Sequence, residues 1–257
     1  GDLNLAHVPP NTCKKRDDDA AMSSRGKHDR KKSEKTKMTD ATTGSTGSIG
    51  THSSTSSSHT GSGAAAATHT TRNFEFSGRD FDENGLIYYL GTKTSKNNGE
   101  SRSGWQNPGK SGAVRVSSSP LAESPPSLPA WGALSRESVR CVTRPRKHSY
   151  FEVDFTPSKL RIRPTAYSLR HYSSWDSEAV RHWKLQATND RKTWTTLRDH
   201  KYDCSLDGKG DTATWRISGQ IEEAYSVFRV LQTGVNSNGH WFLALAGFEV
   251  YGVAEFD

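Results

Sequence analysis

The region from residue 160 to residue 200 has the clearest pattern of apolar and polar positions in the chain. Trp183, Leu185 and Ala187 alternate with the polar residues between them, which is the period of two expected of a strand with one buried face. The pair Asn189-Asp190 follows, and these residue types tolerate the left-handed backbone of a tight turn. The pattern therefore predicts a β-hairpin at the centre of the fold.

Apolar or alternating runs predict further short strands elsewhere in the chain. They are residues 86–91, 112–119, 150–155, 160–169, 213–218, 225–234 and 242–253. Helical periodicity is nearly absent, and only residues 135–142 could form a single helical turn. Residues 120–132 contain four prolines, which predicts an irregular segment. Many short strands separated by turn residues predict an all-β fold, a sandwich or barrel of about eight strands.

The aromatic residues on these predicted strands are candidates for the core. Trp183, Trp194, Trp215 and Phe248 lie on alternating segments, so we expect all four to be buried. The two strands of the central hairpin each carry one Trp, which makes a cross-strand pair between Trp183 and Trp194 the expected arrangement.

The N-terminal part of the chain has a different composition. Residues 1–72 contain none of the 24 aromatic residues and are rich in Ser, Thr, Gly, Ala, Lys and Asp. Such a segment buries too little apolar surface to offset the entropy of ordering it. We therefore predict a disordered tail or linker over 1–72, a folded domain over 73–253 and a continuation over 254–257. The basic cluster at 25–37 is either a localisation or polyanion-binding segment or a solvated charge run.

Charge and cysteine content narrow the class of protein. The formal net charge of +7 divides into +4 for the tail and +3 for the rest, so the folded domain is not expected to bind nucleic acid. Cys13, Cys141 and Cys204 form no CxxC motif, which favours reduced thiols in an intracellular compartment, cytoplasmic or nuclear. No segment approaches the roughly 20 apolar residues of a membrane span. The chain does not begin with Met, which suggests a piece of a longer protein.

Motifs for catalysis are sparse. Residues 104–111 match the GxxxxGK[ST] spacing of a phosphate-binding loop, but no buried strand precedes them and Pro108 removes one of the amides that would face a phosphate. Asp203, Asp207 and Asp211 lie in a Gly-containing loop without the spacing of a known calcium site. We expect no catalytic residues, no metal and no cofactor.

Five segments, taken in order, resemble the galactose-binding-like β-sandwich of the discoidin, or coagulation-factor type C, superfamily. The resemblance is greatest to the subgroup found in a HECT-type E3 ubiquitin ligase and in BTB/POZ-domain proteins. The segments are FDENGLIYYLGT (81–92), WQNP (105–108), PTAYSLRH (164–171), RHWKLQATNDRKTWTTLRDH (181–200) and FLALAGFEVYG (242–252).

The resemblance implies a non-catalytic jelly-roll sandwich of about eight strands, embedded in a larger protein, with recognition loops at one end. The family often has a Ser-x-Asp-Gly turn before the second Trp of the hairpin. Here the turn is Thr188-Asn189-Asp190-Arg191, so the Gly is missing. Sugar binding does not follow from the superfamily name, because a fold does not fix a function.

Candidate recognition residues lie in two loops beside the predicted hairpin. Aromatic and Arg side chains are the usual anchors of recognition surfaces. The alternative for Arg170 and Arg181 is an ion pair inside the sandwich with Asp154, Asp176 or Glu178. The alternative for His171 is a purely structural role. The candidates are Arg170, His171, Tyr172, Trp175 and Arg181 in the first loop and Asn238 and His240 in the second.

These observations predict a recognition module that binds another protein or peptide. By the resemblance, it would help a larger ubiquitin-ligase or BTB-type adaptor protein to recruit or hold a partner. The alternative is a carbohydrate-binding, lectin-like module, because the same loop aromatics could stack on a sugar. The domain itself is expected not to be an enzyme.

Overall fold

The computed structural model describes residues 70–97 and 104–256, and the predicted tail lies outside the described residues up to residue 69. Residues 70–72, the end of the predicted tail, belong to the first strand. The strands are β1 (Thr70–Phe74), β2 (Arg115–Ser118), β3 (Tyr150–Asp154), β4 (Leu160–Arg170), β5 (Trp183–Thr188), β6 (Thr195–His200), β7 (Thr212–Arg216), β8 (Val227–Gln232) and β9 (Gly247–Phe256). The helices are α1 (Leu86–Asn97) and α2 (Pro108–Ser111), with the 3-10 turns η2 (Ala130–Leu134) and η3 (Thr156–Ser158).

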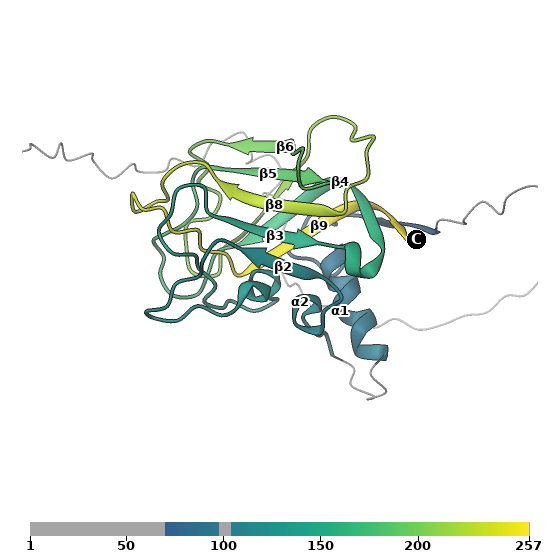
Figure 1. The fold of residues 1–257 in the computed structure, drawn as a ribbon, viewed down its shortest axis with the longest axis horizontal. Coiled ribbons are helices and arrows are strands. Elements are labelled where there is room, and N and C mark those ends of the chain that lie inside the picture. Colours follow the sequence, from purple (N-terminus) through teal and green to yellow (C-terminus); the bar gives the residue numbers. More distant parts are fainter. Residues whose placement is uncertain (1–69, 98–103, 257) are drawn as a thin grey trace, which may run out of the picture. The chain divides into compact units, whose positions relative to one another are not determined.

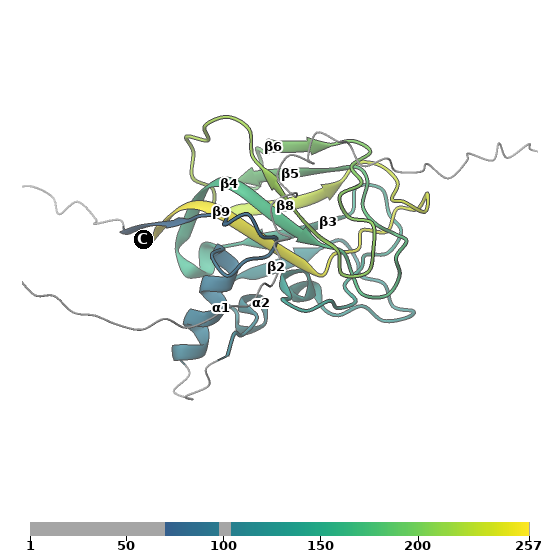
Figure 2. The same cartoon turned by 180° about the vertical axis from the view of Figure 1, so that it is seen from behind.

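The strands form two antiparallel sheets that pack face to face, so the predicted β-sandwich is confirmed. One sheet has the order β1-β9-β4-β7 and the other the order β2-β3-β8-β5-β6. Figure 1 shows the second sheet in front, and Figure 2 shows the first sheet from behind. The predicted hairpin is present, because β5 and β6 pair on either side of the turn at residues 189–194.

A bulge bends the longest pair of strands, β4 and β9. The register shifts between Pro164 and Ala166, and Pro164 lies opposite Gly252. A proline cannot donate to the ladder and is tolerated where the pairing is already interrupted. Gly252 has φ +143°, and a Cβ there would collide with the carbonyl of Arg163, so the close approach of these strands requires glycine.

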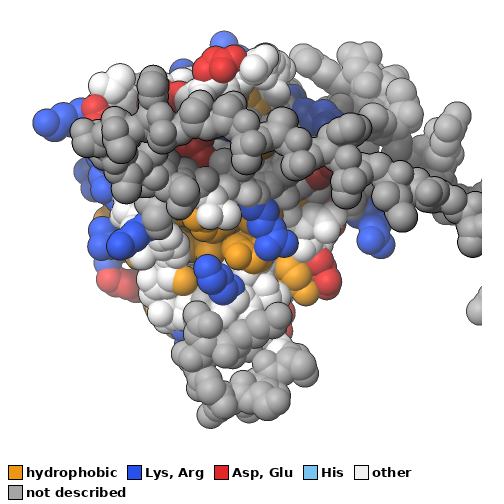
Figure 3. All heavy atoms as spheres, turned by 90° about the vertical axis from the view of Figure 1, so that its right-hand side faces the viewer, with side chains coloured by type: hydrophobic (Ala, Val, Ile, Leu, Met, Phe, Trp, Pro, Cys, Tyr) orange, Lys and Arg blue, Asp and Glu red, His pale blue; other side chains and the backbone are white. Residues whose placement is uncertain are grey.

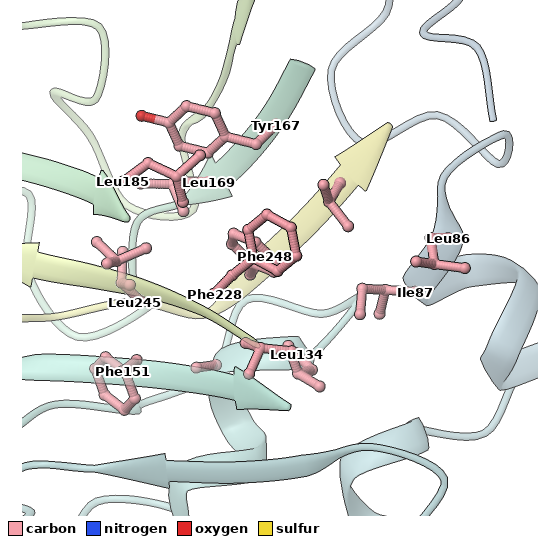
Figure 4. Close-up of a cluster of buried hydrophobic side chains, with 14 of the residues drawn as sticks. Leu86, Ile87, Leu134, Phe151, Tyr167, Leu169, Leu185, Phe228, Leu245 and Phe248 are labelled. Atoms are coloured by element: carbon pink, nitrogen blue, oxygen red, sulfur yellow. The ribbon is translucent and has the colours of Figure 1, made fainter. Parts of the chain in front are cut away.

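The core lies between the two sheets and continues under α1. It contains the inward-facing residues of both sheets, among them Phe151, Tyr167 and Phe248. Figure 4 shows these side chains together with Leu86 and Ile87, which come from the first turn of α1. Burial on this scale is the main stabilising contribution to a domain of this size.

The prediction of a strand at residues 86–91 is wrong, because these residues begin helix α1. The backbone N–H groups of Ile87 and Tyr88 donate to the Glu249 carboxylate at 2.7 and 3.0 Å. A carboxylate at a helix N-terminus satisfies amides that have no partner within the helix and interacts favourably with the helix dipole. Gly85 makes room for it, since a Cβ there would overlap the Glu249 side chain. The single helical turn considered for residues 135–142 is also absent.

The expected Trp183–Trp194 pair does not form. Trp183 is buried and stacks on His200, with ring centroids 4.0 Å apart and planes 7° from parallel. Trp194 lies in the turn before β6, is only partly buried, and contacts the Arg229 guanidinium 3.8 Å above its ring. The burial of Trp183, Trp215 and Phe248 agrees with the prediction, whereas Trp194 is not a core residue.

The two ends of the sandwich differ. Four connections meet at one end, which we call the loop end and define as residues 119–149, 171–182, 201–211 and 233–246. Figure 1 shows these loops on the left and α1, β1 and the end of β9 on the right. No helix among the described residues is long and apolar enough to cross a membrane.

Basic and aromatic side chains meet where β1, α1 and β9 lie together. The Cζ atom of Arg72 lies 4.3 Å from the ring centroid of Tyr89, and the Nζ atom of Lys93 lies 5.9 Å from that of Phe256. Figure 3 views this side and shows hydrophobic side chains with Lys and Arg side chains beside them. These cations cover aromatic faces, an arrangement that is weakly stabilising at exposed sites.

Candidate functional site at the loop end

The β4–β5 loop, residues 171–182, is fastened to each of the other three loops of the loop end. Backbone hydrogen bonds make these connections, so the loop has a defined shape without belonging to a sheet. They run from Ser173 N to Val139 O (3.1 Å), from Gly210 N to Tyr172 O (3.2 Å) and from Ser237 N to Ala179 O (2.9 Å).

Trp175 lies in the middle of this loop and is 59% exposed. Among the described residues, the other large apolar side chains with high exposure are Tyr202 (68%) and Val235 (37%). All three lie in loops of the loop end. Exposed apolar side chains that gather in one region mark interaction sites more often than scattered ones do.

His171 supports the loop from beneath. It is fully buried, and its Nε2 atom lies 3.1 Å from the Trp175 carbonyl and 3.2 Å from the Ser177 carbonyl. Carbonyl oxygens only accept, so Nε2 carries the proton and donates to both. Burial lowers the pKa of His171, although these carbonyls act in the opposite direction. The neutral His171 ring therefore holds the backbone at Trp175 in place. This is the structural role that the sequence analysis gave as the alternative to recognition for His171.

Arg170 and Tyr172, on either side of His171, are also supporting groups. The Arg170 guanidinium lies 4.6 Å from the Phe81 ring centroid and donates to the Arg136 carbonyl. Burial and the nearby Arg136 charge lower the pKa of Arg170. Tyr172 is 1% exposed, and burial raises the pKa of its hydroxyl to about 12.

Arg181 joins the β4–β5 loop to the β6–β7 loop. Only 7% of it is exposed, and its guanidinium donates to the Leu206 carbonyl and, at 2.5 Å, to the Asp207 carboxylate. Arg181 is therefore held in an ion pair, which is the structural role that the sequence analysis gave as the alternative to recognition. Its partner is Asp207, which was not among the three carboxylates named there.

Asn238 and His240 converge on Glu178, which the sequence suggested only as an ion-pair partner for an arginine. Its carboxylate accepts from Asn238 Nδ2 at 3.1 Å, from His240 Nδ1 at 2.8 Å and from Asn236 Nδ2 at 2.5 Å. Glu178 has φ +69°, a backbone conformation that is uncommon outside glycine. The closeness of Glu178 to Tyr172 and Trp175 in the sequence could have marked it as a site residue. The partners of its carboxylate lie some 60 residues further along the chain, so the sequence could not show them.

A chain of hydrogen bonds in the interior has the composition of a catalytic relay. Asp203 Oδ2 lies 2.6 Å from His200 Nδ1, and His200 Nε2 lies 2.6 Å from the Tyr167 hydroxyl. His200 is 4% exposed and Tyr167 is fully buried. Burial raises the pKa of Tyr167, so the hydroxyl stays protonated and out of reach of any substrate. The relay is a structural part of the core.

The phosphate-loop spacing at residues 104–111 does not form a phosphate site. Asn107 caps α2, and its Oδ1 atom accepts from the amides of Gly109 and Lys110 at 2.9 and 3.3 Å. Those amides are already satisfied, and the Lys110 Nζ atom lies 5.7 Å from the ring centroid of Trp131. Among the described residues, no three His, Cys, Asp or Glu side chains are grouped so as to hold a metal ion.

The cysteines depart from the prediction of reduced thiols at one position. Cys141 is free and buried, and burial raises the pKa of its thiol to about 12. Cys204 is part of a disulfide, which contradicts the prediction for that residue. Cys13 lies outside the described residues.

Two antiparallel sheets that pack face to face, with loops gathered at one end, define the class of this protein: the described residues form an all-β sandwich domain. The predicted relationship to ubiquitin ligases and BTB/POZ-domain proteins is confirmed by relatives of known name. E3 ubiquitin-protein ligase Ufd4 of Drosophila melanogaster is 38% identical over 178 residues, and E3 ubiquitin-protein ligase hecd-1 of Caenorhabditis elegans is 38% identical over 176 residues. A BTB/POZ domain-containing protein of Arabidopsis thaliana is 28% identical over 181 residues.

The matches cover 67% of this chain for each ligase and 68% for the BTB/POZ protein. The chain in turn spans 6% of the length of each ligase and 21% of the BTB/POZ protein. No family model matches the chain.

Solved structures with a partial likeness include two from Clostridium perfringens. One is a CpGH89CBM32-5 module in complex with GalNAc-β-1,3-galactose, with 10% identity, 55% of this chain and 96% of that chain covered, and a TM-score of 0.44. The other is the family 32 CBM of NanJ in complex with galactose, with 12% identity, 55% and 94% covered, and a TM-score of 0.43. These likenesses are too low to assign a fold or a ligand, and the fold is assigned from the two sheets themselves.

Proposed function

We propose that this domain is a non-catalytic recognition module that binds another polypeptide at its loop end, within a larger ubiquitin-ligase or BTB-type adaptor protein. The observation that carries the proposal is the position of Trp175, Tyr202 and Val235, three exposed apolar side chains on loops of one end. Tryptophan and tyrosine supply large contact areas at low entropic cost and are enriched among residues that dominate binding energy.

The remaining candidates have supporting roles in this proposal. His171, Tyr172, Arg170 and Arg181 are buried or half-buried and fix the loop, so that Trp175 is presented in one position. Asn238 and His240 form the exposed rim around Glu178. A preorganised loop loses less entropy on binding than a mobile one. The proposal places the module inside the cell, in the cytoplasm or nucleus, together with the ubiquitin-ligase machinery of its relatives.

The test is capture from cell lysate by the immobilised 257-residue chain, followed by mass spectrometry. W175A is compared with the wild type and with the control W194A, which removes an indole from the opposite end of the sandwich. Half of the lysate is treated with glycosidases beforehand. We expect proteins that the wild type and W194A retain, that W175A loses, and that deglycosylation does not affect.

Two other outcomes contradict the proposal. If W175A captures the same proteins as the wild type, the loop end around Trp175 is not the binding surface. If capture disappears after deglycosylation, the domain is a carbohydrate-binding module, and Trp175 stacks on a sugar.

A further inference from the structure

A basic segment at the loop end lies outside the candidate residues. We call residues 144–148 the basic strap; its sequence is Arg-Pro-Arg-Lys-His, and every residue in it is exposed. Within the described residues, the only ion pair of the strap joins Arg144 to Glu123. Arg146 and Lys147 have no carboxylate partner among these ion pairs and present their charges to solvent.

Hydrogen bonds hold the backbone of the basic strap. The amide of Arg144 donates to the Pro120 carbonyl at 2.7 Å, and that of Arg146 donates to the Trp241 carbonyl at 3.3 Å. The hydroxyl of buried Ser149 donates to the Arg146 carbonyl at 2.8 Å. The positive charges therefore project from a fixed backbone, which reduces the entropy lost when a partner binds.

Trp241 lies against the strap and is half-buried. The Nζ atom of Lys147 lies 5.9 Å from its ring centroid, and the ring of His148 lies 6.2 Å from it. Basic groups arranged around an aromatic ring combine charge recognition with apolar contact.

A groove of about 550 Å³ opens beside Arg144. Most of its lining comes from the proline-rich segment and its flanks, and it combines apolar with polar side chains: Pro120, Leu121, Ala122 and Pro126 with Ser118, Ser119, Glu123, Ser127 and Arg144. A groove with a mixed apolar and polar lining, beside the basic strap, fits a chain that carries both carboxylates and an apolar side chain.

We propose that the basic strap and this groove bind an acidic polypeptide segment, with Asp or Glu side chains on Arg144, Arg146 and Lys147 and an apolar side chain in the groove. Glu123 occupies Arg144 in the unbound protein as an internal carboxylate. The side chains of Arg144 and Glu123 are 50% and 76% exposed. Exposed ion pairs contribute little to stability, so an incoming carboxylate can replace Glu123. This inference rests on the proposed function, since it names the chemistry of a polypeptide partner at the same end.

The experiment measures fluorescence anisotropy of a fluorescein-labelled ten-residue peptide of Asp and Glu with one central Leu, titrated with the 257-residue chain in dilute buffer. We expect R146Q/K147Q to weaken binding about fivefold, the order of magnitude for two exposed charge contacts. The control K159Q/K192Q removes two exposed positive charges from the opposite end and should change the affinity less than about twofold. E123Q should instead strengthen binding about threefold, because it releases Arg144.

Circular dichroism verifies that each variant is folded. Equal weakening by the two double variants would mean that the peptide responds only to net charge, and the proposal falls. It also falls if a ten-nucleotide oligo-dT binds more tightly than the peptide and loses this binding in R146Q/K147Q, since the strap would then be a nucleic-acid surface. W194A, which removes an indole from the opposite end of the sandwich, should leave the peptide affinity unchanged. The lysate test varies Trp175 and this titration varies Arg146 and Lys147, so the failure of one is distinguishable from the failure of the other.

Discussion

Glu249 and Asp203 are both carboxylates of the interior, yet their pKa values move in opposite directions. Burial raises the pKa of Glu249 to about 7, although hydrogen bonds from backbone amides act against it. Burial also acts to raise the pKa of Asp203, but hydrogen bonds from His200 and Ser205 outweigh it, and the pKa falls to about 2. The comparison shows that burial alone does not decide the charge of an interior carboxylate.

The difference follows from solvent access and from the donors. The Glu249 side chain is completely buried, and its nearest cation, Arg136, is 3.6 Å away. The Asp203 side chain is 16% exposed and accepts from the His200 ring at 2.6 Å and the Trp215 indole at 3.0 Å. Partial hydration together with two ring donors keeps Asp203 ionised, whereas Glu249 is on the border between its two forms at neutral pH.

The largest expected effect is from E249A, which removes the acceptor for the first turn of α1. The amides of Ile87, Tyr88 and Val250 lose their partner, and a cavity is left. We expect the free energy of unfolding to fall by about 4 kcal/mol, the size found when one partner of a buried ionic group is removed.

Urea denaturation at pH 7 measures this loss. The control is E249Q, whose amide oxygen still accepts at the helix N-terminus, and it should lose less than half as much. If E249A is as stable as the wild type, the helix does not depend on Glu249.

The second prediction concerns pH. The native pKa of Glu249, about 7, lies above its ordinary value of 4.5, so the folded protein binds more protons between these values. This contribution to stability is fully present below about pH 4.5 and is lost as the pH rises through 7. At about 1.4 kcal/mol per pKa unit, the loss is roughly 3 kcal/mol at most.

Urea denaturation of the wild type and of E249Q from pH 5 to pH 8 isolates this effect, because Asp203 and His200 titrate alike in both proteins. The wild type should lose stability relative to E249Q as the pH rises. A difference that is constant over this range would show that the pKa of Glu249 is not raised.

A smaller effect is expected from H200F, which keeps an aromatic ring against Trp183 but removes both hydrogen bonds of the imidazole. Asp203 then retains Trp215 as a side-chain donor. We expect a loss of about 2 kcal/mol at pH 7, because hydrogen bonds to charged groups contribute more than neutral ones.

Thermal and urea denaturation measure the effect of H200F. Y167F is the comparison, because it deletes the hydroxyl at the other end of the relay, which also accepts from the Trp183 indole at 3.0 Å. Y167F should lose less than H200F. Equal stability of H200F and the wild type would mean that the relay does not stabilise the fold.

Most of the sandwich was predictable from the sequence, because its strands alternate with a period of two. The hairpin of Trp183, Leu185 and Ala187 shows this directly, since the side chains that the pattern places inward are fully buried. Helix α1 was not predictable in this way. Leu86 and its neighbours have the apolar and aromatic composition of a strand, and the carboxylate that fixes the helix, Glu249, is 162 residues away from Ile87.

The candidate site was predictable only in part. Trp175 is exposed, and its part in recognition stays a prediction. Arg181 and His171 were indistinguishable from it in the sequence, and only contacts with Leu206, Asp207 and the loop carbonyls show that they are buried. The basic strap was visible as a run of charges, but its groove depends on the distant proline-rich segment.

The pairing of β1 with β9 has a consequence for how a larger protein of the proposed kind could carry this domain. Thr70 lies opposite Phe256, so the chain enters and leaves the sandwich through neighbouring strands, on the side away from the loop end (Figure 1). Adjacent strands are about 5 Å apart. A host protein can therefore carry this domain as a side branch inserted at a single point of its surface, with the loops directed outward.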